Sequence, residues 1–191
     1  MSHAQTHQPL SEDAYLRQEA EADIKHEYVS GEAYAMAGAS ERHNRIALNI
    51  AYHLRNITRG KTCRAFMAAM KLRITASATF YCPDVMLVCD PADDHPIYKQ
   101  APCLIAEVLP PATATTDMRE KWQAYRALQS LRYYLLVESE RLWTSVFFRK
   151  EGGDWFEQEL LPEDILDVQC DGVRLNLTLD DLYEDTGLLV V

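Results

Sequence analysis

The spacing of apolar residues predicts two helices early in the chain. Helical periodicity begins after Ser11, where two acidic residues open an exposed helix, and it begins again after Ser40. Serine is a residue type that caps helix N-termini. The second helix is expected over about residues 41–59, because Gly60 interrupts the periodic pattern.

At 100° per residue, this second helix has one apolar and one polar face. The apolar arc contains Ile46, Ala47, Ile50, Ala51, Leu54 and Ile57, and the polar side carries Arg45, Tyr52, Arg55 and Arg59. His43 falls inside the apolar arc. We therefore expect His43 to point toward the core, where a hydrogen-bonded histidine and a residue that exchanges a proton at a functional site are both possible.

Strand-like segments account for much of the remaining chain. Residues 24–39 have the pattern of two short strands joined by Ser30 and Gly31, as in a β-hairpin. Later apolar runs, punctuated by prolines, predict strands at about Thr62 to Thr75, Val85 to Cys89, Cys103 to Leu109, Arg132 to Glu138 and Trp143 to Arg149. Helices are expected at about residues 117–129 and 179–183. The chain is therefore predicted to have an α/β fold.

The composition is that of one ordinary globular domain. The chain has 191 residues, of which 48% are hydrophobic and 25% charged. We expect a flexible tail over residues 1–10 and a single domain over residues 11–191. The first residues lack a basic start followed by an apolar run, and no apolar stretch approaches the roughly 20 residues of a spanning helix. The sequence thus favours a cytoplasmic protein without a membrane anchor.

The formal net charge of −10 argues against broad nonspecific binding to nucleic acid. One segment departs from this balance, because residues 42–73 contain no Asp or Glu but many Lys and Arg. We expect four arginines of this segment to contact nucleic acid: Arg42, Arg45, Arg55 and Arg59. A solvated helix face would explain the same charges.

The five cysteines lie in or beside apolar runs, and none is spaced as Cys-x-x-Cys. A thiol in such surroundings usually packs as a small hydrophobic group. We therefore expect reduced cysteines, in keeping with a cytoplasmic protein, and no zinc site.

Two carboxylates stand out because they occupy apolar surroundings. Asp84 follows Pro83 and opens the run VMLVC, and Glu107 lies inside LIAEVL. An ionised carboxylate is costly in such a place unless a cation or good hydrogen bonds compensate it. A shared divalent cation would do so, and oxygen ligands suit Mg²⁺ or Mn²⁺. Either acid could instead reach solvent at a strand end or pair with an arginine.

Lys121 is a third unusual residue. On the helix predicted at 117–129 it shares an arc with the apolar positions, while Arg119, Gln123 and Arg126 occupy the other side. A lysine on an inward face either extends its ammonium group to solvent or directs it at an anionic site.

The order of these residues resembles the PD-(D/E)XK superfamily of restriction-endonuclease-like nucleases, and within it the bacterial Uma-type family. The matching positions are Glu27, Gly31, His43, Pro83 with Asp84, Glu107 with Val108 and Leu109, then Asp117, Lys121 and Tyr125. The superfamily pattern has lysine two residues after the glutamate, where this chain has Leu109. The resemblance therefore implies that Lys121 supplies the lysine from the following helix, and Pro110 replaces the serine usual after Glu-Val-Leu.

The resemblance implies a restriction-endonuclease-like core, with a central mixed sheet flanked by helices, and a metal-dependent DNA endonuclease that dimerises. Asp84, Glu107 and the Val108 carbonyl would bind Mg²⁺ or Mn²⁺. Lys121 would orient water or stabilise charge on the phosphoryl group. Glu27 would assist at the metal or face solvent, and His43 and Tyr125 would be accessory residues.

Two other classes of function remain open from the sequence. One is a nuclease fold that binds DNA or regulates a partner without turnover. The other is a structural dimerisation protein, which the acidic composition favours.

Overall fold

The computed structural model describes residues 9–110, 114–150 and 152–189, with residues 114–117 described only in their backbone. The helices are α1 (Glu12–Glu21), α2 (Glu41–Thr58), α3 (Ala114–Tyr125), α4 (Leu179–Tyr183) and the 3₁₀ turn η1 (Thr75–Ser77). None of the helices in these ranges is long and apolar enough to cross a membrane.

Six strands form what we call the large sheet, in the order β11-β10-β9-β8-β6-β3. Their bounds are β3 (Arg64–Met67), β6 (Val85–Val88), β8 (Pro102–Leu109), β9 (Tyr133–Glu138), β10 (Thr144–Arg149) and β11 (Trp155–Glu159). The pairing of β8 with β9 is parallel and the other pairings are antiparallel. The predicted mixed sheet flanked by helices is therefore confirmed.

Five shorter strands form what we call the small sheet, in the order β2-β1-β5-β4-β7. Their bounds are β1 (His26–Val29), β2 (Glu32–Ala35), β4 (Lys71–Ile74), β5 (Thr79–Tyr81) and β7 (Tyr98–Lys99). A separate hairpin consists of β12 (Leu166–Cys170) and β13 (Val173–Leu177).

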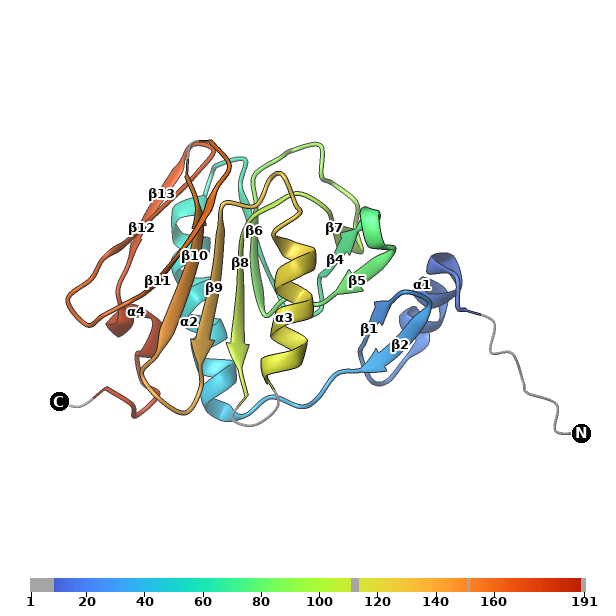
Figure 1. Cartoon of the computed structure of the whole chain (residues 1–191), viewed down its shortest axis with the longest axis horizontal. Coiled ribbons are helices and arrows are strands. Elements are labelled where there is room, and N and C mark those ends of the chain that lie inside the picture. The colour runs from blue at the N-terminus through green and yellow to red at the C-terminus, as the bar shows by residue number, and fades with distance from the viewer. Residues whose placement is uncertain (1–8, 111–113, 151, 190–191) are drawn as a thin grey trace, which may run out of the picture.

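The large sheet is covered on both faces (Figure 1). Helix α2 packs on one face through its predicted apolar arc, and Ile46, Ile50 and Leu54 are fully buried there. Helix α3 covers the other face, where Tyr125 is fully buried in a second cluster. Every residue of β8 is buried, as its continuous apolar sequence predicts.

The small sheet presents β1 to the core through the predicted hairpin. Ser30 and Gly31 join β1 to β2, with φ angles of 52° and 96°. Positive φ at both central positions is typical of a type I′ turn, in which glycine is favoured. A Cβ atom on Gly31 would also lie 2.6 Å from Cβ of Pro9. The turn therefore depends on glycine for both conformation and space.

Two sequence predictions about this region need correction. The strand expected over 62–75 is two strands, β3 and β4, which belong to different sheets. The chain reverses between them, and Ala68 has a φ of 38°. Strand β5 was not predicted, because it has only three residues and its Thr-Phe-Tyr sequence is too short for a periodic signal.

The cysteines also differ from expectation. Cys63 and Cys89 form one disulfide and Cys103 and Cys170 form another, so only Cys82 matches the predicted buried thiol. The apolar runs around these cysteines agree with their burial, but pairing depends on which strands become neighbours. Cys63 and Cys89, for example, flank the antiparallel partners β3 and β6.

The predicted tail is only partly within the described residues, because residues 1–8 lie outside them. Leu10 donates its N–H to the carbonyl of Gly31 at 2.8 Å and accepts from the Tyr28 hydroxyl at 2.6 Å. The chain is therefore attached to the β1–β2 hairpin from Leu10 onward.

A thiol titration before and after reduction tests the two disulfides. Because two bridges occupy four of the five cysteines, unfolded unreduced protein should contain one reactive thiol, and reduced protein five, in a thiol titration. Cys82→Ala should lower the first count to zero, whereas Cys103→Ser should raise it to two by releasing Cys170. Cys103→Ser should also lower the free energy of unfolding by about 2–4 kcal/mol. Five thiols before reduction would contradict the pairing.

Candidate functional site

Four elements bring ionisable side chains to one place between the two sheets and α3. Asp84 lies just before β6, Glu107 lies on β8, Glu27 lies on β1 and Lys121 lies on α3. We call these four residues the carboxylate cluster. Their side chains are at most 16% exposed. Of the three acids, Glu107 is the one on a strand that is buried on both faces. Four predicted site residues that are far apart in the sequence thus lie close together in the fold.

Lys121 lies between two acids of the cluster. Its Nζ is 2.9 Å from Oε1 of Glu27 and 3.6 Å from Oε1 of Glu107. The ammonium group also lies 5.4 Å from the centroid of the Tyr81 ring. The Lys121 side chain therefore does not extend to solvent. Its ammonium group is directed at acidic side chains, which was the other possibility for a lysine on the inward face of the helix.

Hydrogen bonds fix one oxygen of each carboxylate. Asp84 Oδ2 accepts from the Val108 N–H at 2.7 Å. Glu107 Oε1 accepts from the Tyr125 hydroxyl at 2.8 Å, and Glu27 Oε1 accepts from the Cys82 N–H at 3.0 Å. In each acid the contacts described converge on a single oxygen, so the other oxygen is the one oriented for a further partner.

His43 approaches Asp84 from the first turn of α2. Its Nε2 lies 3.3 Å from Asp84 Oδ2, and its Nδ1 is buried without a hydrogen-bond partner among the described residues. A proton on Nε2 fits both observations. The hydrogen bond to Asp84 raises the pKa of His43 above its usual value, burial opposes the shift, and the charges of Asp84 and Glu107 and the Val108 backbone add to it.

The surroundings of Glu107 disfavour its ionised form. Burial raises its pKa from 4.5 to about 7; the Lys121 ammonium opposes this shift, whereas the charges of Asp84 and Glu27 add to it. Near neutral pH, a large fraction of Glu107 is therefore protonated unless another cation approaches.

The oxygen donors of the cluster fit a hard divalent cation. Val108 directs its N–H toward Asp84, and the N–H and C=O of one strand residue point to the same side. Asp84 and the Val108 carbonyl therefore lie on the same side of β8, and the neighbouring Glu107 is close enough for the charge of Asp84 to act on it. Within the described residues, no three His, Cys, Asp or Glu side chains already surround one point. Mg²⁺ needs only one or two carboxylates, with water completing its shell.

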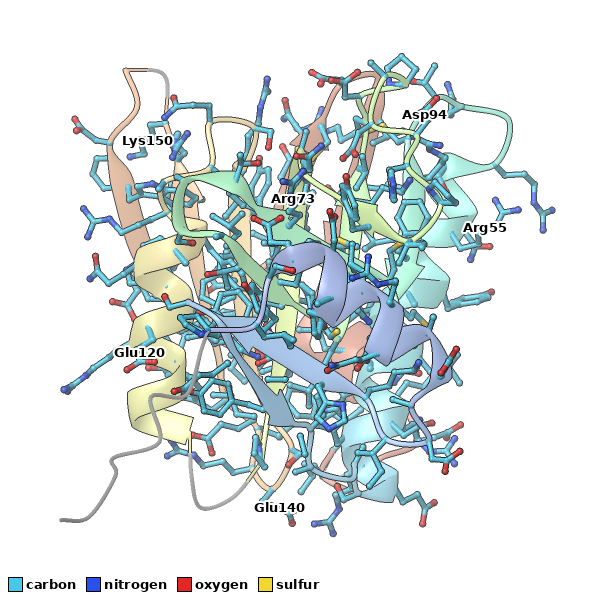
Figure 2. The ribbon with its side chains drawn as sticks, turned by 90° about the vertical axis from the view of Figure 1, so that its right-hand side faces the viewer. Arg55, Arg73, Asp94, Glu120, Glu140 and Lys150 are labelled. Atoms are coloured by element: carbon cyan, nitrogen blue, oxygen red, sulfur yellow. A yellow bond between two sulfur atoms is a disulfide. The ribbon has the colours of Figure 1, made fainter. Side chains whose placement is uncertain are left out.

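The arginines predicted to contact nucleic acid do not gather at the cluster. Arg42 donates to Glu140 at 2.6 Å and to the Thr186 carbonyl at 3.3 Å. Arg45 lies 3.6 Å from Glu41. Arg55 lies near the other end of α2, roughly 18 Å along the helix axis from His43 at 1.5 Å per residue. Figure 2 shows Arg55 and Glu140 at different ends of the molecule.

Arg59 follows the last turn of α2, is exposed and lies farther still from His43. The four arginines thus lie along a helix that begins at the cluster and leads away from it.

Sequence reasoning missed two contributors to the cluster. Tyr81 places its ring against Lys121, and Cys82 supplies the backbone N–H that holds Glu27. Both directly precede Pro83-Asp84, so their position beside that motif was an available signal. The side chain of Asp117, another residue of the family pattern, lies outside those described.

The sheet, its flanking helices and the acid-lysine cluster define a restriction-endonuclease-like fold. A solved structure described as "a putative nuclease belonging to DUF820", from Anabaena variabilis, shares this fold with a TM-score of 0.71. It is 15% identical, and the match covers 92% of this chain and 98% of that one.

The sequence comparisons identify the family. The model of the Uma2 family, described as "Putative restriction endonuclease", matches residues 12–180, and this protein belongs to that family. Two proteins of Synechocystis sp. are each 32% identical: slr1290 over 91% of this chain and 91% of its own length, and sll1609 over 81% and 89%. Both carry the description "uncharacterized protein".

The raised pKa of Glu107 predicts a pH-dependent stability change. Unfolded Glu107 ionises near pH 4.5 and folded Glu107 near pH 7, so the folded protein loses stability as pH rises between these values. Glu107→Gln removes this loss. The free energy of unfolding of the variant minus that of the parent should therefore increase by about 1–3 kcal/mol from pH 5 to pH 8. Urea unfolding without metal measures both values.

Glu138→Gln is the control. Its partner Arg141 holds the pKa of Glu138 below the usual value, so the stability that Glu138 contributes is present above about pH 4.5 and is lost in acid. The difference in free energy of unfolding between Glu138→Gln and the parent should stay constant from pH 5 to pH 8. An equally flat difference for Glu107→Gln would refute the raised pKa.

Proposed function

We propose that this protein is a metal-dependent endonuclease that hydrolyses phosphodiester bonds in DNA. The observation that carries the proposal is the meeting of three acids and one lysine: Lys121 lies between Glu27 and Glu107, and the contacts described for each acid converge on a single oxygen. Family membership supports the same function, because the Uma2 family carries the description "Putative restriction endonuclease".

Asp84, Glu107 and the Val108 carbonyl would hold Mg²⁺ or Mn²⁺. The bound ion supplies polarisation of the phosphate and a water of lowered pKa. A doubly charged ion would also compensate the repulsion between Asp84 and Glu107, which contributes to the raised pKa of Glu107. Binding would therefore shift Glu107 toward its ionised form.

The remaining residues of the cluster have distinct roles in this proposal. Lys121 would stabilise negative charge on the phosphoryl oxygens or orient the attacking water. Glu27 would hold the Lys121 ammonium group near the substrate. Tyr125 and His43 would fix the orientations of Glu107 and Asp84 through the hydrogen bonds described above.

A DNA-binding or regulatory module without turnover is the alternative. Leu109 favours it, because the superfamily pattern has a lysine at that position on the strand. The two functions share the metal site and differ in cleavage. The following two experiments address metal binding and cleavage separately.

Metal binding should depend on both acids of the metal site. We expect calorimetric titration to detect Mn²⁺ binding by the parent and no measurable binding by Asp84→Ala or Glu107→Ala, because each variant removes a charged ligand. Glu138→Gln, an acid next to the same end of β8, should bind as the parent does. Unchanged affinity in both alanine variants would rule out this site.

Cleavage should depend on Lys121. We expect Lys121→Met to retain Mn²⁺ binding but to cut plasmid and linear DNA at least 100-fold more slowly, since loss of one charge-stabilising donor typically costs 10²–10³ in rate. Arg126→Met, a change on the outward side of the same helix region, is the matched control. Cleavage by Lys121→Met at the parent rate would contradict the lysine assignment. A parent protein that binds Mn²⁺ and DNA without cutting would support the alternative function.

A further inference from the structure

A second buried ion pair lies on the opposite face of the small sheet from the carboxylate cluster. Lys71 of β4 and Glu19 of α1 lie 3.2 Å apart, and they are 3% and 4% exposed. A buried ion pair often contributes no more stability than apolar residues of the same volume. Stability alone therefore gives little reason for this pair, and its other contacts are informative.

Glu19 also reaches β1, the strand that carries Glu27. The N–H of His26 donates to Glu19 Oε1 at 3.0 Å, and His26 Nδ1 lies 3.1 Å from Glu19 Oε2. The Tyr15 hydroxyl donates to the carbonyl of His26. Both backbone polar groups of His26, and its ring, are thus held by side chains of α1.

The residue on the other side of Glu27 is fixed to the same region. The Tyr28 hydroxyl donates to the Leu10 carbonyl, and its ring stacks on Tyr15 with 4.9 Å between centroids. The register between β1 and β5 contains a single pair, Tyr28 with Phe80. Contacts with α1 and the segment before it therefore supply much of the restraint on β1, and Figure 2 shows α1 lying across the outer face of the small sheet.

Successive strand residues point to opposite faces. His26 and Tyr28 contact α1, whereas Glu27 between them points to the inner face and binds Lys121. We propose that Glu19 is a positioning residue for Glu27, which it acts on through the backbone of His26. This inference rests on the proposed function, in which Glu27 holds the ammonium group of Lys121.

In the proposed site, the Lys121 ammonium group and a metal ion would compete for the carboxylate of Glu107. Glu27 holds the Lys121 Nζ at 2.9 Å, while the same nitrogen stays 3.6 Å from Glu107. If Glu27 shifts, the ammonium group can pair more closely with Glu107 and compete with a metal ion for its charge. Loss of the Glu19 contact should therefore weaken metal binding without removing any metal ligand.

Two substitutions separate positioning from the ion pair. Glu19→Gln removes the charge that pairs with Lys71 but keeps an oxygen that can accept from the His26 N–H. Glu19→Met removes both. Both variants should lower the melting temperature. Only Glu19→Met should weaken Mn²⁺ binding, by about 10-fold or more, as loss of outer-shell partners of a metal site commonly does.

A matched control is present on the same two elements. Glu12 of α1 pairs with Arg73 of β4 at 2.9 Å but makes no described contact with β1. Glu12→Met should leave Mn²⁺ affinity unchanged. An equal loss in Glu12→Met and Glu19→Met would mean that general docking of α1 is responsible, and it would overturn the proposal.

A double variant tests the competition directly. In Glu19→Met combined with Lys121→Met, the competing ammonium group is absent, so Mn²⁺ affinity should return to that of Lys121→Met alone. A purely structural role of Glu19 predicts the same 10-fold loss in both backgrounds.

A metal-free readout distinguishes failure of this inference from failure of the proposed function. The Cys82 N–H donates to Glu27, so its proton chemical shift reports the position of the Glu27 carboxylate. In Glu19→Met this shift should move toward the value in Glu27→Ala, and in Glu19→Gln it should stay near the parent value. An unmoved Cys82 signal in Glu19→Met would overturn the inference. If the signal moves as expected but the parent binds no Mn²⁺, the positioning role stands and the metal-dependent function fails.

Discussion

The carboxylate of Glu107 lies within a strand that is covered on both faces, and the surrounding structure is organised to tolerate it. Burial and two neighbouring acids disfavour its ionised form, whereas the Lys121 ammonium group and the Tyr125 hydroxyl favour it. Lys121 can help only because α3 crosses that face of the large sheet. Glu27 reaches Lys121 only because the small sheet packs beside α3. The compensation of the Glu107 charge thus depends on contacts among the large sheet, α3 and the small sheet.

Much of this arrangement follows from local sequence. The apolar arc of α2, the continuous apolar run of β8 and the inward direction of Lys121 are all periodic signals, and the structure agrees with each. The meeting of Asp84 with Glu107 was inferred from two neighbouring strands, which is what β6 and β8 are. Their roles in catalysis remain predictions.

Other features could not be predicted, because they depend on contacts between distant segments. Lys71 belongs to the basic segment 42–73, whose charges a solvated face would also explain, but its partner Glu19 lies 52 residues earlier on another element. The cystines depend on strand neighbours in the same way. Arg42 was predicted to contact nucleic acid, yet it pairs with Glu140, 98 residues away. Sequence periodicity gives the direction of a side chain but not the identity of its neighbour.

The order of the cluster along the chain also bears on biosynthesis. Glu27 leaves the ribosome early, but the lysine that it binds belongs to α3 and follows 94 residues later. Domains generally acquire their tertiary contacts only when the participating segments are available. A nascent or prematurely terminated chain that ends before residue 121 therefore has the acids without the cation that pairs with two of them. Completion of α3 is a requirement for assembling the site, so incomplete translation products carry no finished centre.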